Sequence, residues 1–388
     1  MRIGFDGGCL ANRRGFGRFA RQVLAALAEE PGRHEFVVFV DRPSVEVVRV
    51  PERFETVVVG VREAPSRAAS AEGSRGVGDL WAMGRAVARA KLDLMFFPAS
   101  YSFFPVWGVR RVVVTMHDTL ALAHPELVFP TWKGRILWKV KEYAAARAAD
   151  RIVTVSRAAR RDLMAWFGWP EEKIALVTEA PDAVFRPRPS GPQSDETLAR
   201  YGIEPGSRFL LYVGGLSPHK NILRLIEAFA KAAPGDVRLV LVGDVGDVFH
   251  THVPALREAV TRLGLGGRVV LTGFVPDADL AEVYSRAEAL VQPSLMEGFG
   301  LPQVEAMACG TPVLCSTAGS LPEVVGDAGA YFDPRDLESM AGAIATFLAD
   351  PAVRGRLADR ALRRAEGFSW ATSARMLLDC FEALDPDR

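Results

Sequence analysis

The clearest structural signal in the chain is the stretch PSLMEGFGLPQVEAMACGTPV, which occupies residues 293–313. It follows a short apolar run, crosses a glycine-rich loop, and enters a helical pattern with Pro302 in the first turn and Gly310 at the end. This order of strand, glycine loop and helix is typical of parallel α/β sheets, whose ligands bind beyond the carboxyl ends of the strands. The stretch therefore predicts an α/β fold with a binding site at this loop.

The chemistry of the same stretch indicates a ligand. The backbone amides of residues 298–301 would lie at a helix N-terminus, which favours a phosphate group. Two carboxylates, Glu297 and Glu305, flank the loop, and they need a different partner because carboxylates repel phosphate. Sugar hydroxyls are the natural partner, since the two oxygens of one carboxylate suit a vicinal diol. One acid for a ribose and one for a second sugar, with a diphosphate between them, describes a nucleotide sugar.

The rest of the chain alternates short Val/Leu/Ile runs with helical patterns, which indicates parallel sheets covered on both faces. The first half predicts strands at 2–5, 36–40, 56–59, 92–97, 112–115 and 152–155, and helices at 17–29, 79–91, 132–149 and 157–166. The second half predicts strands at 209–213, 238–242, 269–272, 289–292 and near 313 and 331, and helices that begin near 221, 254, 278, 301 and 336. The proline-rich residues 181–193 read as a linker. We therefore predict two doubly wound, Rossmann-like α/β domains facing a cleft.

Charge and cysteine content limit which cellular compartment and which classes of binding partner are expected. The 388 residues carry 47 Lys and Arg against 47 Asp and Glu, but residues 1–188 have 29 basic and 21 acidic residues, a net of +8, and residues 189–388 have 18 and 26, a net of −8. A basic half could steer an anionic acceptor or lie near an anionic membrane, but it comes with no zinc-finger or RNA-binding signature, so no nucleic acid is expected. Four scattered cysteines, an early acid at Asp6 and no long apolar run predict a cytoplasmic protein without a signal peptide or membrane span.

A second glycine loop is LYVGGLSPHKNI, residues 211–222, in which Gly215 follows a strand and Lys220 stands where a helix begins. A lysine beside a helix N-terminus suits a phosphate, although the loop lacks the Gly-Lys-Ser/Thr of a Walker A sequence. The alternative is a lysine that is simply solvated. We predict that Lys220 binds phosphate.

A third glycine pattern lies near the N-terminus. The spacing Gly15-x-Gly17-x-x-Ala20, with Asp41 at the end of the next strand, matches a dinucleotide fingerprint and keeps an NAD-dependent oxidoreductase as an alternative. Gly15, however, lies about nine residues past the strand, whereas the fingerprint places its first glycine in the tight turn. We interpret the segment as a flexible loop whose backbone approaches a ligand, with Arg18 directed at an acceptor or a phosphate.

His117 and Asp118 follow another predicted strand and are candidates for the same edge of a sheet, with Asp118 on the acceptor side. No serine or cysteine hydrolase signature accompanies them. Asp277 and Asp279 have a spacing that could hold a metal diphosphate, but helix capping and first-turn charge explain them better, so we expect neither a metal nor another cofactor.

Residues 131–161 form a basic segment in which tryptophans are interleaved with lysines and arginines. A basic, Trp-bearing helix can lie on an anionic membrane. The favoured interpretation is a crossover helix whose apolar face packs on the sheet. Peripheral association of the basic N-terminal domain with the inner face of the cytoplasmic membrane is the second hypothesis.

Together these segments resemble glycosyltransferase family 4, the retaining GT-B group, over nearly the whole chain. Glu297 and Glu305 fit the family's E-x7-E signature inside its E-G-F-G-L-P-x-x-E run, and His117 fits its strand-end histidine. The similarity extends to further segments, namely 213–221, the glycine-rich 7–18, and Phe368-Ser369-Trp370 at the start of a C-terminal helix that crosses back to the first domain. The run 117–126 is most similar to bacterial mannosyltransferase-like members.

The resemblance implies roles for individual residues. Glu305 would hold the ribose, Glu297 the hydroxyls of the donor sugar, and Lys220 the leaving diphosphate. His117 would contact the donor sugar near the reacting carbon. The remaining donor-binding residues would be Gly17, Gly215, Phe274, Val275, Gly298, Phe299, Gly300 and Leu301.

The resemblance also implies the domains and the activity. Residues 1–185 with the C-terminal helix 368–388 would bind the acceptor, and residues 186–367 would bind a GDP- or UDP-linked sugar. The enzyme would move a hexose, mannose first and glucose next, to a hydroxyl of a glycan, a lipid-linked molecule or a small molecule, with retention and without metal. A non-catalytic nucleotide-sugar-binding protein remains an alternative.

Two positions depart from the family. Gly215 stands where many members have an arginine beside the diphosphate, and His219 or Arg18 could compensate for that charge. The common Asn-Gly-Val-Asp at the domain junction reads Glu-Ala-Pro-Asp here, with Glu179 in place of the asparagine.

Overall fold

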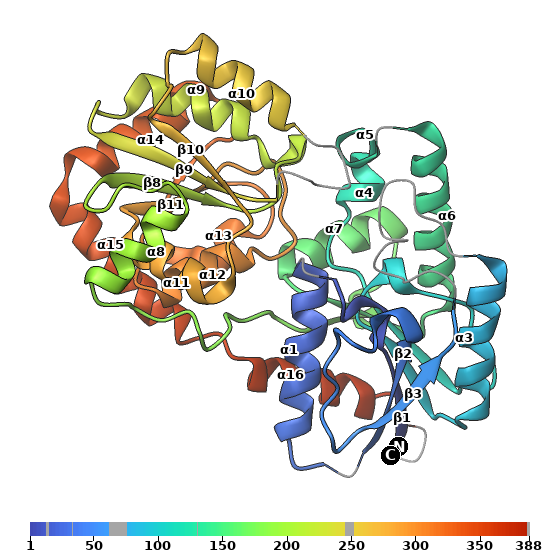
Figure 1. Cartoon of the computed structure of the whole chain (residues 1–388). Coiled ribbons are helices and arrows are strands. Elements are labelled where there is room, and N and C mark those ends of the chain that lie inside the picture. Colours follow the sequence, from blue (N-terminus) through green and yellow to red (C-terminus); the bar gives the residue numbers. More distant parts are fainter. Residues whose placement is uncertain (13–14, 33, 62–75, 130, 245–251, 386–388) are drawn as a thin grey trace. The chain divides into compact units, whose positions relative to one another are not determined.

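The computed structural model describes residues 1–12, 15–32, 34–61, 76–129, 131–244 and 252–385 (Figure 1). The chain forms two compact units. The first combines Met1–Glu179 with Ser369–Arg388, and the second is Ala180–Phe368. No helix of the described part is both long and apolar enough to cross a membrane.

The first unit is built on a seven-stranded parallel sheet of order β3-β2-β1-β4-β5-β6-β7. Its strands are β1 Arg2–Asp6, β2 Glu35–Asp41, β3 Glu55–Val59, β4 Leu94–Phe97, β5 Arg111–Thr115, β6 Arg151–Thr154 and β7 Ile174–Leu176. Its helices are α1 Gly15–Glu29, α3 Val77–Arg89, α4 Leu120–Ala123, α5 Pro125–Val128, α6 Trp132–Ala148, α7 Arg157–Phe167 and α16 Trp370–Glu382. Short 3-10 turns lie at 7–9, 42–44, 100–102 and 171–173.

The second unit has a six-stranded parallel sheet of order β10-β9-β8-β11-β12-β13. Its strands are β8 Arg208–Val213, β9 Val237–Val242, β10 Val269–Gly273, β11 Ala289–Gln292, β12 Val313–Ser316 and β13 Gly329–Phe332. Its helices are α8 Pro192–Arg200, α9 Ile222–Ala232, α10 Val253–Arg262, α11 Asp277–Arg286, α12 Leu301–Ala308, α13 Leu321–Val325, α14 Leu337–Ala349 and α15 Pro351–Ala365, with 3-10 turns at 218–220 and 326–328.

Buried apolar residues explain why these elements form. In the second unit, Leu210 and Tyr212 of β8 pack with Leu225 and Phe229 of α9 in one continuous core, as the near-continuous apolar strands of a parallel sheet require. In the first unit, α7 begins where Ser156 accepts a hydrogen bond from the amide of Ala159 (3.0 Å). The predicted α/β class with two parallel sheets is confirmed.

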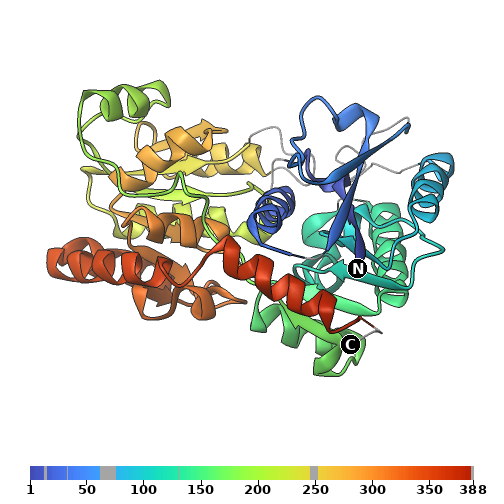
Figure 2. The same cartoon turned by 90° about the horizontal axis from the view of Figure 1, so that it is seen from below.

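The C-terminal helix belongs to the first unit, also as predicted. The Ser369 hydroxyl accepts a hydrogen bond from the amide of Thr372 (3.1 Å) where α16 begins, and α16 then packs against α1 (Figure 2). The ring of Phe381 contacts that of Phe96 in β4, at 5.3 Å between centroids. Residues 386–388 of the predicted helix lie outside the described part.

Four expectations need correction. Gly15 to Arg18, predicted to be part of a flexible loop, form the first turn of α1, and Arg13 and Arg14 of that loop lie outside the described residues. β7 and α8 were missed, because β7 has three residues and α8 begins at Pro192, inside the predicted linker. The large apolar residues of α6 do not pack on the sheet, because Glu142, Ala145 and Ala146 occupy the buried side of that helix. Lastly, Asp277 and Asp279 were predicted to cap helix α11 and to place charge in its first turn. Both lie in the first turn, but neither is the N-cap residue, which is Pro276.

Candidate functional site

The strongest candidate site lies where β8 and β11 end. These strands are neighbours in the second sheet, so the loops that follow them meet at the same edge. The amide of Leu295 donates to the carbonyl of His219 (2.9 Å), and the side chain of Asn221 donates to the carbonyl of Pro293 (3.1 Å). These bonds join the two glycine loops that the sequence singled out.

Lys220 and Glu297 form an ion pair at this edge. The Lys220 Nζ lies 2.7 Å from Oε1 of Glu297, with side chains 18% and 13% exposed. The same Oε1 also accepts hydrogen bonds from Nε2 of Gln292 (3.0 Å) and Oγ of Ser294 (2.7 Å). Burial alone would raise the pKa of Glu297, but Lys220 and the Ser294 hydroxyl outweigh it and hold that pKa below its usual value. Glu297 is therefore a carboxylate.

The two oxygens of Glu297 differ in their surroundings. Oε1 is saturated by three donors, whereas Oε2 accepts no hydrogen bond from any residue that the structure describes. The sequence suggested that a vicinal diol would use both oxygens; the geometry leaves only Oε2 open to a ligand. The carboxylate is thus fixed in orientation and presents one acceptor.

A segment that the sequence analysis missed fastens the 293–300 loop. Gly319 has a φ of +60°, and a Cβ there would lie 2.6 Å from the carbonyl oxygen of Glu297. The Ser320 hydroxyl donates to the carbonyls of Glu297 (3.1 Å) and Phe299 (2.7 Å). The position of the carboxylate therefore depends on residues that touch only the loop's backbone.

The start of α12 follows the loop. Gly300 has a φ of +111°, a left-handed conformation that favours glycine, and Pro302 occupies the first turn as predicted. Within the described part of the chain, the amides of Phe299, Gly300 and Leu301 donate to no other residue. They are available at a helix N-terminus, which suits an anion.

Glu305 lies in the second turn of the same helix and is 2% exposed. Its Oε2 accepts a hydrogen bond from the hydroxyl of Tyr284 (3.1 Å). Beyond the end of β10, at the same edge of the sheet, Phe274 is 54% exposed and Val275 is buried. The second unit thus contains Lys220, Glu297 and Glu305 as well as all but one of the predicted donor-binding residues: Gly215, Phe274, Val275, Gly298, Phe299, Gly300 and Leu301.

The charge missing at Gly215 is not supplied by His219. Burial first, and the neighbouring Lys220 second, lower the pKa of His219 to about 3, so its imidazole is neutral. A neutral His219 adds no positive charge beside Gly215, which counts against the hypothesis that it compensates for the absent arginine. The carbonyl of Gly215 instead accepts a hydrogen bond from the hydroxyl of Tyr212 (2.6 Å), which holds the loop against β8.

The first unit holds His117 just beyond β5. Its ring is packed by Phe16 and Phe19, at 4.8 and 5.0 Å between centroids. Its Nε2 lies 3.0 Å from the carbonyl oxygen of Pro98, and its Nδ1 lies 3.5 Å from Oε1 of Glu179. Both ring nitrogens of His117 thus face oxygen acceptors of the protein. Glu179, at the junction where the sequence departs from the family pattern, is therefore the buried partner of the histidine.

Two further acids lie close to His117. Oδ1 of Asp118 accepts a hydrogen bond from the amide of Leu120 (2.8 Å) at the start of α4. Glu142 of α6 accepts one from the Ser100 hydroxyl (2.6 Å), yet burial, with a smaller contribution from Asp118, raises its pKa to about 7. No local sequence pattern distinguishes Glu142 as a site residue.

The N-terminal glycines have structural roles. A Cβ on Gly17 would lie 1.9 Å from the carbonyl oxygen of Asn12, so glycine is needed for the close approach of α1 to the preceding turn. Arg18 is half-buried in the first turn of that helix. Asp41, which an NAD site would direct at a ribose, is buried and accepts hydrogen bonds from the backbone amide (3.1 Å) and hydroxyl (2.8 Å) of Ser44. This geometry does not favour a dinucleotide site.

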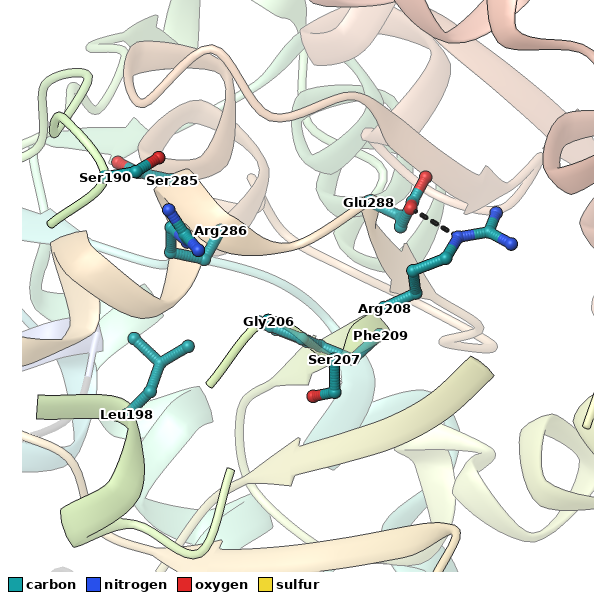
Figure 3. A pocket seen from close by; sticks show the side chains of 9 residues that line it. All are labelled: Ser190, Leu198, Gly206, Ser207, Arg208, Phe209, Ser285, Arg286 and Glu288. Carbon is teal, nitrogen blue, oxygen red and sulfur yellow. Dashed lines mark hydrogen bonds and ion pairs between the residues drawn. The ribbon is translucent and has the colours of Figure 1, made fainter. Parts of the chain in front are cut away.

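A hollow in the second unit lies elsewhere. It opens at the amino-terminal end of β8, where Arg208 pairs with Glu288 (2.9 Å) and Ser285 and Arg286 end α11 (Figure 3). The residues of the candidate site lie at the opposite, carboxyl end of the same sheet. None of the predicted site residues lines this hollow.

Comparison with known proteins identifies the family. Residues 13–180 match the model of Glycosyltransferase Family 4, and residues 193–364 match that of Glycosyl transferases group 1. The chain is 33% identical over 288 residues to the O-antigen chain mannosyltransferase B of Escherichia coli, covering 73% of each chain. The chain belongs to glycosyltransferase family 4.

A second similar protein has a different name. The chain is 32% identical over 302 residues to the D-inositol 3-phosphate glycosyltransferase of Kineococcus radiotolerans, covering 73% of this chain and 68% of the relative. The chain is therefore a glycosyltransferase of the hexosyltransferase kind, as the resemblance implied. The oxidoreductase and the non-catalytic binding protein are not favoured.

Solved structures show the same fold. Sucrose-phosphate synthase from Thermosynechococcus elongatus superposes with a TM-score of 0.73 at 22% identity, covering 99% of both chains. HepE of Anabaena, solved with UDP and glucose, also gives a TM-score of 0.73, at 21% identity, covering 99% of this chain and all of the other. Two parallel sheets of seven and six strands, with helices on both faces, make this family 4 enzyme a GT-B protein.

Proposed function

We propose that this family 4 enzyme transfers a hexose from a nucleoside diphosphate sugar to an acceptor hydroxyl with retention of configuration. The observation that carries the proposal is the fixed carboxylate of Glu297, which has one oxygen saturated by Lys220 and neighbours and one oxygen open. An acceptor of this kind suits a hydroxyl of the donor sugar. The available amides at the start of α12 suit its diphosphate.

Each residue then has a chemical task. Oε2 of Glu297 accepts a hydrogen bond from the donor sugar, and the buried Glu305 binds the ribose. When the bond from the anomeric carbon to the diphosphate breaks, negative charge develops on a phosphate oxygen. Lys220 and the amides of Gly300 and Leu301 stabilise that charge in the manner of an oxyanion hole. The acceptor hydroxyl attacks from the face the diphosphate leaves and gives its proton to the departing phosphate oxygen, so no side-chain nucleophile is required.

Mannose is the first expectation for the sugar, with glucose second. Mannose has the support of the 33% identity to a mannosyltransferase, and a uridine nucleotide has the support of the UDP bound to HepE. The acceptor is a glycan, a lipid-linked molecule or a small molecule that approaches the basic first unit, where His117, Arg18 and Asp118 lie. GDP-mannose and UDP-glucose are therefore the donors to test first.

The remaining features of the proposal concern metal and compartment. Lys220 and backbone amides can neutralise a leaving diphosphate, and on that chemistry we expect transfer to proceed without a metal. The four cysteines are buried and form no disulfide bond in the described part of the chain, which suits the reducing cytoplasm where we place the enzyme.

The test is a thermal-shift panel with GDP, UDP, GDP-mannose, UDP-glucose and NAD, each with and without EDTA. A ligand at 100 times its dissociation constant adds about 2.7 kcal/mol of stability, which gives a readily measured shift. We expect one nucleoside diphosphate and its sugar to stabilise the wild type regardless of EDTA. Glu297→Gln should keep the shift with the free diphosphate and lose the additional shift with the sugar. Stabilisation by NAD alone, or only with divalent metal present, would contradict the proposal.

A further inference from the structure

Helix α6 carries its large apolar residues on the outside. Trp132, Ile136 and Val140 are 65%, 55% and 59% exposed, and they follow one another at a spacing of four residues. Tyr143, 43% exposed, continues the row. Of the fourteen exposed large apolar residues in the described part of the chain, five lie on this one helix. A group of exposed apolar residues of this size marks a surface that binds a membrane or another molecule.

All charged side chains that α6 exposes are basic. Glu142 is the only acidic residue between 132 and 148, and it is buried. Lys133, Lys139 and Arg147 are exposed on the same side as the apolar row. We call this side, with its three cations and its exposed apolar residues, the α6 outer face.

Cations and aromatic rings alternate closely on the helix. The ammonium of Lys133 lies 5.9 Å from the ring centre of Trp132, and that of Lys139 lies 5.9 Å from the ring centre of Tyr143. An aromatic ring with a neighbouring lysine is the pairing found where a protein meets the headgroups of a bilayer, because the ring enters the boundary and the ammonium stays with the phosphates.

A neighbouring helix extends the same character. Helices α3 and α6 cover the same face of the first sheet, since Met83 and Ala145 share one core. On α3, Trp81 is 56% exposed and packs on Trp107, with 6.5 Å between ring centres, and the guanidinium of Arg85 lies 4.8 Å from the Trp81 ring. Aromatic and basic side chains are thus exposed on two adjacent elements of one unit.

We infer that the α6 outer face binds the surface of an anionic lipid bilayer. Positive charge with no exposed acid on the helix complements anionic headgroups, and Trp132 and Tyr143 are residues that prefer the bilayer interface. A protein partner fits less well, because α6 contains no Ser, Thr, Asn or Gln to make the hydrogen bonds of such an interface, and lysine is depleted there. The inference does not depend on the proposed donor or acceptor.

The experiment is co-sedimentation of the full chain with vesicles of phosphatidylcholine alone and of phosphatidylcholine mixed with phosphatidylglycerol. We expect the wild type to bind the mixed vesicles, to bind the neutral ones poorly, and to dissociate as salt is raised. Lys133→Glu/Lys139→Glu/Arg147→Glu should weaken binding to mixed vesicles about a hundredfold, since each basic residue near an anionic surface contributes roughly a factor of five. Trp132→Ser/Ile136→Ser, which leaves the charge unchanged, should also bind the mixed vesicles more weakly than the wild type.

The control carries the same change of charge in the other unit. Arg257→Glu/Arg356→Glu/Arg363→Glu reverses three exposed arginines of the second unit and should leave vesicle binding close to that of the wild type. Circular dichroism and donor-induced thermal shift check that each variant is folded. Equal loss in both triple variants, or no binding of the wild type to mixed vesicles, would overturn the inference. So would ultracentrifugation showing that the α6 substitutions dissociate a dimer while vesicle binding is unchanged.

Discussion

Replacing Lys220 with Met tests whether the Lys220–Glu297 pair is a working part of the enzyme or only a structural bond. The substitution removes the charge and keeps much of the side-chain volume. Glu297 then remains in a site where it is 13% exposed, with two neutral donors and no cation at Oε1. We expect the variant to be folded, less stable, and inactive.

The loss of stability follows from the burial of both partners. Removing one member of a buried ion pair costs about 3–5 kcal/mol, and the residual exposure of these side chains favours about 3 kcal/mol. For a unit of this size, about 3 kcal/mol corresponds to a fall in melting temperature of roughly 6–12 °C. The variant Lys220→Met/Glu297→Gln removes the stranded charge, so it should recover most of this loss.

The pH dependence should change sign. In the wild type the lowered pKa of Glu297 contributes stability above the ordinary carboxyl pKa, and that stability is lost as the pH falls through the lowered value. Without Lys220, burial dominates and raises the pKa of Glu297 above that of the unfolded chain. Lys220→Met should then gain stability from this group as the pH falls from neutral toward the raised pKa and below it.

Urea unfolding at several pH values and single-turnover donor consumption measure the two consequences separately. Both single variants and the double variant should lose at least about a hundredfold in turnover, the usual cost of removing a charge-stabilising donor. Lys220→Met with wild-type stability and an unchanged pH slope would refute the electrostatic reasoning. A double variant that regains transfer would show that the pair is only structural.

Three further perturbations test individual contacts. Glu142→Gln should raise the free energy of unfolding by about 3 kcal/mol at pH 8 and by little at pH 4. The reason is the pKa of Glu142, about 7 in the folded chain, which makes its ionised form costly as the pH rises. Urea unfolding measures this difference, and equal effects at both pH values would contradict the raised pKa. Gly319→Ala should lower kcat at least about tenfold by moving the 293–300 loop. Gly206→Ala, at a φ of +77° with no atom within 4 Å, is its matched control, and equal activity loss in both would contradict the contact. Glu179→Ala should lower kcat about tenfold by freeing His117, with Glu179→Gln retaining more activity in the same assay; an unaffected Glu179→Ala would count against a positioning role.

The sequence predicted twelve of the thirteen strands in the described sheets, all but β7, because their signals are local. The apolar run before Pro293, the left-handed glycine at 300 and the proline at 302 specify a strand, a turn and a helix start within ten residues. Lys220 and Glu297 were selected for the same reason, since each follows a strand. Their direct pairing was not predicted, because it depends on β8 and β11 being neighbours in the sheet.

Contacts between distant segments account for what the sequence could not supply. Gly319 and Ser320 hold the backbone of Glu297 from 22 and 23 residues away, and no local pattern distinguishes them from an ordinary turn. Glu179 lies 62 residues from His117 and looked only like a departure from a motif. On α6, apolar residues occur on all sides, so the pattern could not reveal that small alanines face the sheet and Trp132 faces outward.

The ion pair also explains how one site could hold a carboxylate and a diphosphate without conflict. Lys220 is one of three donors to Oε1 of Glu297, so it can turn toward a phosphate while Gln292 and Ser294 keep that oxygen satisfied. A carboxylate held by the lysine alone would lose its only partner in the same movement, at the cost of an unpaired buried charge. Because Gly215 offers no side chain and His219 is neutral, this movable lysine carries more of the diphosphate charge than it would beside an arginine. We therefore expect Gly215→Arg to tighten diphosphate binding at low salt, measured by calorimetry, and unchanged affinity would contradict this division of charge.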